Sequence, residues 1–150
     1  MGTRGFTFIE VLLVIIIVGV LIAIAVPSFE RYIERSRLVE TTVEIGTMQK
    51  RIRDHEMAKG ALPDDLADVG YGGKLDAWGR SYEYLNLRNM KGNGKARKDK
   101  SLAPLNSDFD LYSVGRDGVT QASLSNQASR DDVVRARDGR FVGLAEEFDP

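Results

Sequence analysis

The chain has 150 residues, a formal net charge of −1, one histidine and no cysteine. This length allows one domain of ordinary size, and the near-zero charge gives no general reason to expect nucleic acid or an anionic surface as a partner. The lack of cysteine excludes disulfides and thiolate ligands. A single histidine leaves few of the residue pairs that nucleophilic catalysis or zinc binding requires, so the composition argues against an enzyme.

The N-terminal segment is apolar enough to enter a membrane. Residues 11–26 carry no charge, and residues 6–26, 21 in number, can cross about 30 Å of hydrocarbon as a helix. Glu10 interrupts this segment, and a carboxylate inside a spanning helix costs on the order of 2.5 to 3.5 kcal/mol unless it is protonated, interfacial or paired. Glu10 is therefore a candidate functional residue, and the alternative is that it sits at headgroup depth.

A positive partner for Glu10 arises if residues 1–5 are removed as a leader. Phe6 then gains an α-amino group, which is charged at neutral pH and can pair with the Glu10 carboxylate of a neighbouring subunit. Because an unpaired buried carboxylate is unfavourable, this pair would select the axial register of an assembly.

Residues 4–12, RGFTFIEVL, resemble the leader signal of type IV pilins and pseudopilins. In that family a membrane aspartyl peptidase, the prepilin peptidase, cuts after the glycine and methylates the new terminus. The resemblance therefore implies cleavage between Gly5 and Phe6 and N-methylation of Phe6. It also implies assembly roles for Glu10, Gly19 and Pro27. The last two lie where the helix of this family weakens, because an interior Gly costs roughly 1 kcal/mol and an interior Pro roughly 3 kcal/mol of helix stability. The segment between them could therefore lose helicity when the subunit is extracted from the membrane.

An ordinary secretory signal is the main rival interpretation of this segment. The residues Ala23-Ile24-Ala25 fit a small-residue cleavage site after an apolar core. Cleavage there would release a soluble enzyme or binding domain that starts at Val26. The carboxylate of Glu10 within the apolar run argues against it.

The helical pattern continues beyond the apolar segment as an amphipathic stalk over residues 27–60. No proline occurs between residues 28 and 62, and Gly60 supplies a stop signal. At 100° per residue the apolar side chains divide into two nearly opposite faces, which suits a helix that packs its own domain with one face and neighbouring helices with the other. A helix buried within a single domain is the alternative. The first face holds Leu38, Ile45, Met48 and Ile52, and the second holds Phe29, Tyr32, Ile33, Val39, Val43 and Met57.

Residues 61–150 are predicted to form a globular region packed on the stalk. Residues 62–70 predict a short acidic helix with Pro63 in its first turn and Gly70 at its end. Residues 76–84 predict a turn followed by a strand, and residues 109–114 predict a second strand. The simplest core is a small antiparallel sheet against the long helix, which gives an α+β fold of the type IV pilin kind.

Two segments of the globular region resemble signatures of the major pseudopilin of type II secretion systems. Residues 76–84, DAWGRSYEY, resemble its Asp-Pro-Trp-Gly-x-Pro-Tyr signature with both prolines replaced, and residues 111–118, LYSVGRDG, resemble its calcium-binding loop. The resemblance implies Ca²⁺ bound by three carboxylates and one backbone carbonyl, and calcium prefers six to eight oxygen ligands. The implied ligands are Asp117, Asp131, Asp132 and the carbonyl of Val114, and Asp108, Asp110 or Asp138 could replace one of the last two carboxylates. Ordinary turn and capping chemistry is the alternative.

The segment 86–107 is locally basic. Its lysines and arginines, opposed by Asp99 alone, give it a charge of +5. We interpret it as a solvated loop or as an electrostatic contact with an acidic protein surface. Nucleic-acid binding is not expected, because the basic residues are not interleaved with aromatic ones.

Taken together, these resemblances imply a structural subunit of a type II secretion pseudopilus rather than an enzyme. Such a subunit forms a homopolymer that drives protein export across the outer membrane. It is anchored in the bacterial inner membrane by one helix, with its C-terminal domain in the periplasm. Its partners are the prepilin peptidase, minor pseudopilins and the inner-membrane assembly platform. The alternatives are a true type IV pilin, which serves adhesion, motility or DNA uptake, and a soluble domain released near Ala25.

Overall fold

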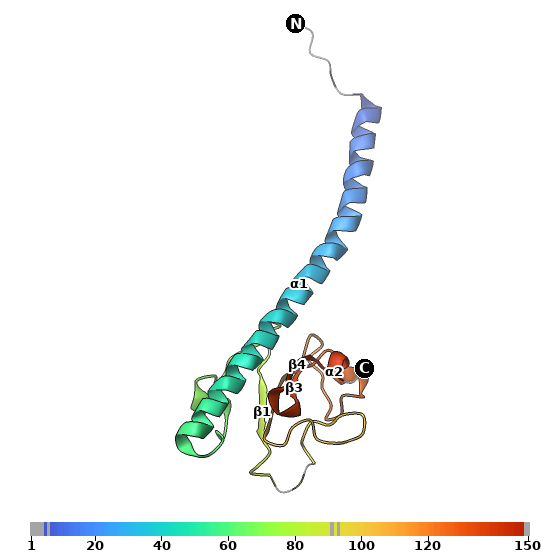
Figure 1. Cartoon of the computed structure of the whole chain (residues 1–150). Helices are drawn as coiled ribbons and strands as arrows, with labels where there is room; N and C mark the ends of the chain where they lie inside the picture. The colour runs from blue at the N-terminus through green and yellow to red at the C-terminus, as the bar shows by residue number, and fades with distance from the viewer. Residues whose placement is uncertain (1–4, 6, 91, 93, 149–150) are drawn as a thin grey trace. The chain divides into compact units, whose positions relative to one another are not determined.

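The computed structural model describes residues 5, 7–90, 92 and 94–148, and the chain divides into two compact units, 1–36 and 37–150. Helix α1, Phe8–Lys59, runs through both units (Figure 1). It ends at Gly60, whose φ of +75° lies in the left-handed region that glycine adopts without steric cost. The predicted long helix and its stop signal are confirmed.

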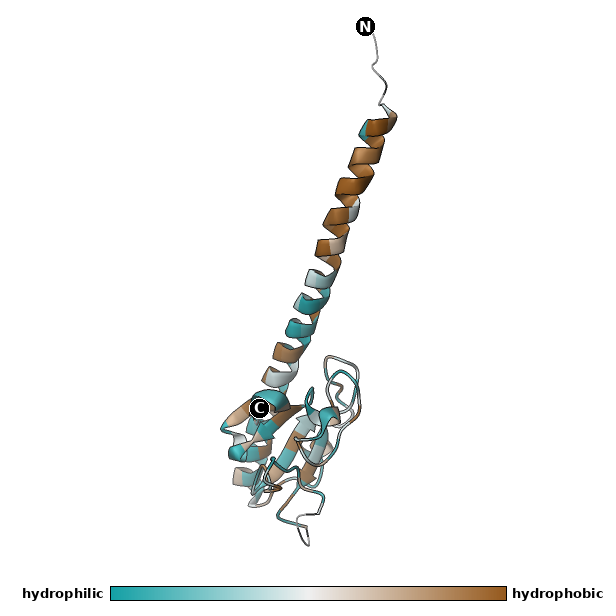
Figure 2. Cartoon of the chain, turned by 90° about the vertical axis from the view of Figure 1, so that its right-hand side faces the viewer, coloured by the Kyte–Doolittle hydropathy of each residue, from teal (hydrophilic) through white to brown (hydrophobic). Residues whose placement is uncertain are grey.

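The first unit consists mainly of the apolar half of α1, coloured brown in Figure 2. Among the described residues, α1 is the one helix that is long and apolar enough to cross a membrane. Pro27 lies inside it and cannot donate a backbone hydrogen bond to the preceding turn. The helix nevertheless continues, and the hydroxyl of Ser28 donates to the carbonyl of Ile24 at 2.9 Å.

A four-stranded antiparallel sheet forms the centre of the second unit. Its strands are β1 (Glu83–Asn86), β2 (Phe109–Ser113), β3 (Val133–Ala136) and β4 (Phe141–Leu144), in the order β1-β2-β3-β4. The register places Tyr84 opposite Leu111 and Tyr112 opposite Val134. The predicted α+β architecture is confirmed, and β3 and β4 are two strands for which the sequence pattern gave no prediction.

One face of the sheet packs against α1. The side chains of Ile45, Met48 and Ile52 are fully buried there and belong to the same cluster as Leu111 and Val133. Their spacing of three and four residues places them on one side of the helix, as predicted. The opposite face of the sheet is covered by irregular chain and by the short helix α2 (Ala145–Phe148), in a second cluster of Leu105, Leu124, Val134, Ala136 and Ala145.

The predicted short helix at residues 62–70 begins later than expected. It is a single 3-10 turn, Leu66–Val69, whose N-cap is Asp65. The Asp65 carboxylate accepts from the backbone N–H of Ala67 at 2.6 Å, and the Asp68 side chain bonds back to the cap. Pro63 therefore lies before the helix and not in its first turn, because this capping box fixes the start. Gly70 ends the turn as predicted, with a φ of +83°.

A buried arginine connects the sheet to α1. Arg135 on β3 has a fully buried side chain, and its guanidinium donates to both carboxylate oxygens of Asp108, at 2.8 and 2.7 Å. It also donates to Gln49 Oε1 on α1 at 2.6 Å and to the carbonyl of Phe109 at 2.7 Å. Its guanidinium lies 3.8 Å from the centre of the Phe109 ring. The charge is thus fully paired, which burial requires.

Candidate functional site

The start of α1 contains the predicted assembly residues. Thr7 is the N-cap, since its carbonyl accepts from the N–H of Val11 at 3.3 Å, and Glu10 is the third helical residue. Glu10 Oε2 lies 3.4 Å from both the backbone nitrogen and the hydroxyl of Thr7. This is half of a capping box, so Glu10 has a local role beside the predicted intermolecular one. Gly5 is described, whereas Phe6, the predicted site of methylation, lies outside the described residues.

Gly19 and Pro27 occupy the interior of the apolar helix. No heavy atom lies within 4 Å of a Cβ placed on Gly19, so packing within the chain does not require a glycine there. Pro27 removes one helix hydrogen bond. Both residues are thus unexplained by the fold of the single chain, and their roles in assembly stay predictions.

In the second unit, α1 exposes an apolar stripe opposite its buried face. We define the stripe as Val39, Val43 and Met57, which are 56%, 62% and 77% exposed. The helical positions of these residues coincide within about 40°, at 100° per residue. Ile45, Met48 and Ile52 on the other side are fully buried in the domain core. The predicted division of the helix into a buried and an exposed apolar face is therefore confirmed, and the packing of neighbouring helices on the exposed face stays a prediction.

The predicted ion loop brings Asp117 and Asp131 together. The backbone N–H of Asp117 donates to Asp131 Oδ2 at 2.9 Å, and Asp117 Oδ1 accepts from the N–H of Val119 at 2.8 Å. Gly115 has a φ of +65°, and a Cβ there would lie 2.2 Å from the carbonyl oxygen of Asp131, so only glycine permits this approach. The two acidic residues thus take part in turn chemistry, which was the alternative interpretation of this loop.

Asp132 is turned into the interior, where an arginine neutralises it. Its Oδ2 accepts from Arg97 Nη2 at 2.5 Å and from the hydroxyl of Thr120 at 2.6 Å, and its side chain is fully buried. Burial raises the pKa of Asp132 to about 6, and the Arg97 charge and the Thr120 hydrogen bond oppose that rise. Asp132 and Arg97 therefore form a desolvated ion pair at the foot of the loop.

The three alternative acidic ligands are also engaged within the domain. Asp108 binds Arg135, as described above. Asp110 accepts from the backbone N–H of Arg97 at 2.7 Å and from the Asn106 side chain at 2.9 Å. Asp138 accepts from the backbone N–H of Ser107 at 2.7 Å. Their oxygens therefore connect segments of this chain.

This arrangement does not fit a calcium ion well. Among residues 5, 7–90, 92 and 94–148, no three His, Cys, Asp or Glu side chains gather so that they could hold a metal ion. A dication on Asp132 would also lie beside the guanidinium of Arg97, and like charges repel strongly away from water. Calcium binding by Val114, Asp117, Asp131 and Asp132 stays a prediction of the sequence.

The basic segment 86–107 is only partly the solvated loop that was predicted. Ala96 and Arg97 are buried, and the backbone of Lys98 bonds to the residues 122 and 124 at 2.8 and 2.9 Å. Arg88 pairs with Glu56 on α1. The solvated-loop interpretation is thus wrong for residues 96–98, because Arg97 is held by Asp132 inside the domain. The sequence offered no signal for this, since Arg97 looks like its basic neighbours.

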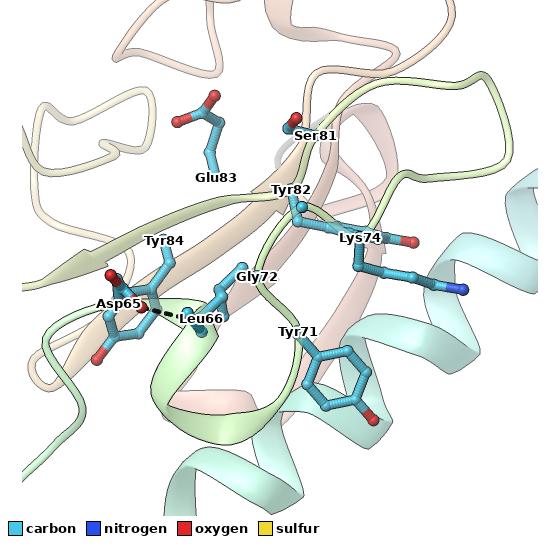
Figure 3. Close-up of a pocket in the computed structure, with 11 residues that line it drawn as sticks. Asp65, Leu66, Tyr71, Gly72, Lys74, Ser81, Tyr82, Glu83 and Tyr84 are labelled. Atoms are coloured by element: carbon cyan, nitrogen blue, oxygen red, sulfur yellow. Dashed lines mark hydrogen bonds between the residues drawn. The ribbon is translucent and has the colours of Figure 1, made fainter.

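A cleft of about 330 Å³ lies between the 3-10 turn and β1 (Figure 3). Two of its polar lining residues are engaged with Glu44 on α1: Lys74 Nζ lies 2.7 Å from Oε1, and the Tyr82 hydroxyl donates to Oε2 at 2.6 Å. Burial, followed by the Glu44 contact, raises the pKa of Tyr82 above its usual range. A tyrosine held neutral in this way is suited to a structural contact rather than to proton transfer.

Comparisons with known proteins relate the chain to pilus proteins. A model of the prokaryotic N-terminal methylation motif matches residues 1–26. The chain is 22% identical over 140 residues to a fimbrial protein of Neisseria meningitidis serogroup A, covering 90% of this chain and 80% of the relative. It is 30% identical over 132 residues to fimbrial protein Q of Moraxella bovis, covering 85% and 73%. It is 43% identical over 49 residues to the type IV major fimbrial protein FimA of Dichelobacter nodosus, covering 33% and 31%. No solved structure matches the chain.

These relatives support the broader prediction from the sequence motifs and do not confirm the narrower one. They are named as fimbrial proteins, so the assignment to a type II secretion pseudopilin is not confirmed, whereas a pilin subunit with a prepilin leader is supported. The leader and the apolar helix together indicate a membrane-anchored filament protein. With 30% identity across most of fimbrial protein Q, the chain belongs to the type IV pilin family.

Proposed function

We propose that this protein is the repeating structural subunit of a type IV pilus. In this proposal the prepilin peptidase removes residues 1–5, the apolar half of α1 holds the subunit in the bacterial inner membrane, and the domain faces the periplasm until assembly. The subunits then form a homopolymer whose centre is made of α1 helices. The similarity to fimbrial proteins over most of the chain supports this function.

The observation that carries the proposal is the division of α1 into two faces. Ile45, Met48 and Ile52 account for the core of the subunit, and the stripe of Val39, Val43 and Met57 is left exposed. Exposed apolar side chains that repeat at helical spacing lose unfavourable contact with water when another helix covers them. In a polymer, the α1 helices of neighbouring subunits would pack on the stripe and remove it from water.

Replacing Val43 by aspartate tests the stripe as an assembly surface. We expect Val43→Asp to leave the melting temperature of the full-length subunit nearly unchanged, since an exposed substitution shifts stability by about 0.5 kcal/mol or less. We expect the same variant to reduce surface filaments at least tenfold in shearing assays, because a carboxylate would be buried without a partner in the helix interface.

Two matched variants separate assembly from folding. Val119→Asp makes the same change at a loop residue that is 53% exposed, and it should leave filaments intact. Ile45→Asp places the charge in the fully buried core and should unfold the domain. Normal filament yield in Val43→Asp would rule out the stripe as an interface.

A secretion pseudopilus is the second candidate, supported by two local features. Residues 76–80 form the turn that the sequence signature predicts, with Trp78 packed against the core, and Gly115 and Gly118 adopt positive φ in the loop of the second signature. Deleting the gene separates the two functions. Loss of surface filaments and twitching with normal exoprotein release supports the pilus, whereas accumulation of exoproteins in the periplasm with normal twitching supports the pseudopilus.

A further inference from the structure

The segment between β2 and β3 is a long connection with little apolar content, held against the sheet mainly by polar contacts. Leu124 is its one fully buried large apolar side chain among the described residues. Ordering such a loop costs conformational entropy, and favourable contacts or a bound ion must offset that cost. The sequence resemblance assigns that role to calcium, whereas the interior of the domain contains a different positive group.

The side chain of Arg97 binds this connection at three points. Its Nη1 donates to the Thr120 hydroxyl and to the carbonyl of Gln121, the latter at 2.8 Å. Its Nη2 donates to Asp132 Oδ2 at 2.5 Å. One guanidinium thus joins the middle of the connection to its end. A bound cation would link the loop in the same way.

The environment of Arg97 fixes it in this position. The residue is 2% exposed, its guanidinium lies 4.4 Å from the centre of the Tyr112 ring on β2, and its backbone N–H is bound by Asp110. The planar fork of arginine keeps its charge at all relevant pH values and loses little freedom per hydrogen bond that it forms. The positive charge is therefore a permanent part of the fold.

We propose that Arg97 is the built-in cation of this loop, and that the subunit orders residues 114–132 through the Arg97–Asp132 pair without a bound metal ion. The charge balance supports this, because the guanidinium already neutralises the buried carboxylate. The two unpaired buried atoms of the pair are Arg97 Nε, a donor, and Asp132 Oδ1, an acceptor. A water molecule can satisfy one of each kind, whereas a second cation would satisfy the acceptor and repel the donor.

The test compares the full-length protein in detergent with millimolar calcium chloride and with EDTA, following thermal unfolding by near-UV circular dichroism. Wild type should melt at the same temperature in both. Arg97→Gln should melt lower by roughly 10 °C or more in both, the effect of leaving one member of a buried pair without its partner in a domain of this size. Hydrogen exchange at the amides of Asp117 and Gln121, which are bonded within the loop, should accelerate in Arg97→Gln.

Two further variants identify the pair as the cause. Lys95→Gln removes an exposed charge from the same segment and should shift the melting temperature by less than about 2 °C. The melting temperature of the double variant Arg97→Gln/Asp132→Asn should fall by much less than the sum of the two single-variant decreases, because the two charges are coupled.

Three results would overturn the proposal. The first is a rise of several degrees in wild-type melting with calcium that Asp117→Ala abolishes. The second is a melting temperature of Arg97→Gln equal to that of Lys95→Gln. The third is additive behaviour of the double variant. The calcium comparison uses wild type and Asp117→Ala, so it tests the proposal even if Arg97→Gln does not fold.

Discussion

Glu10→Gln is expected to abolish filament growth while leaving α1 and the domain folded. Glutamine has nearly the same shape and still accepts a hydrogen bond, so it preserves the cap to Thr7 that the structure shows. It cannot pair electrostatically with the α-amino group that the proposed processing would create at Phe6. Filaments should fall below one tenth of wild type by electron microscopy and by shearing if, as we propose, the charge pair sets the register between subunits.

The capping contact supplies the matched control for this experiment. Thr7→Ala removes the hydroxyl that lies 3.4 Å from Glu10 Oε2 and keeps the charge, so filaments should form. Intact mass of both variants should show a mature chain that begins at a methylated Phe6. If Glu10→Gln assembled normally and Glu10→Ala did not, the role of Glu10 would be helix capping and the charge-pair hypothesis would be wrong.

Helical periodicity explains why the sequence predicted α1 so well. Its two faces follow directly from residue spacing, and Ile45, Met48 and Ile52 proved to be the core while Val39 and Val43 proved to be exposed. Local turn signals at Gly60 and Gly70 were equally informative, because a positive φ is a requirement on the glycine itself. Properties set within a few residues were therefore predictable.

Contacts between distant segments were not predictable from the sequence. Strand β3 was missed because Arg135 occupies an inward-facing position in it, and its partners Asp108 and Gln49 lie 27 and 86 residues away in the sequence. Asp132 was predicted as a calcium ligand from the resemblance to a calcium-binding loop, and its ion pair with Arg97 was not predicted, because Arg97 belongs to a run of similar basic residues. The narrower family assignment depended on two short motifs, and similarity over most of the chain favours pilus proteins.

Arg135→Met is expected to destabilise the domain by about 3–5 kcal/mol, a large fraction of the stability of a domain of this size. The substitution keeps the length of the side chain but leaves the Asp108 carboxylate, 13% exposed, without its cation and Gln49 Oε1 without a donor. Urea unfolding followed by Trp78 fluorescence measures the loss.

Arg140→Met, at an exposed residue of the following turn, should shift stability by about 0.5 kcal/mol or less. Arg135→Met/Asp108→Leu should recover much of the loss, because it leaves no buried charge unpaired.

The dependence of folding stability on acidic pH provides a second measurement of the Arg135–Asp108 pair. Burial by itself would raise the pKa of Asp108, but the hydrogen bonds from Arg135 and from the N–H of Phe109 outweigh it and hold that pKa below its usual value. A carboxyl with a lowered folded-state pKa binds its proton more readily in the unfolded chain, whose Asp pKa is about 3.9. Its stabilising contribution is therefore present above about pH 4 and lost as the pH falls through the folded-state value.

The stability difference between wild type and Asp108→Asn should accordingly be constant from pH 5 to 7 and shrink below about pH 4. A difference that stayed constant at low pH would mean that Arg135 stabilises the domain by packing on Phe109, and not through its charge.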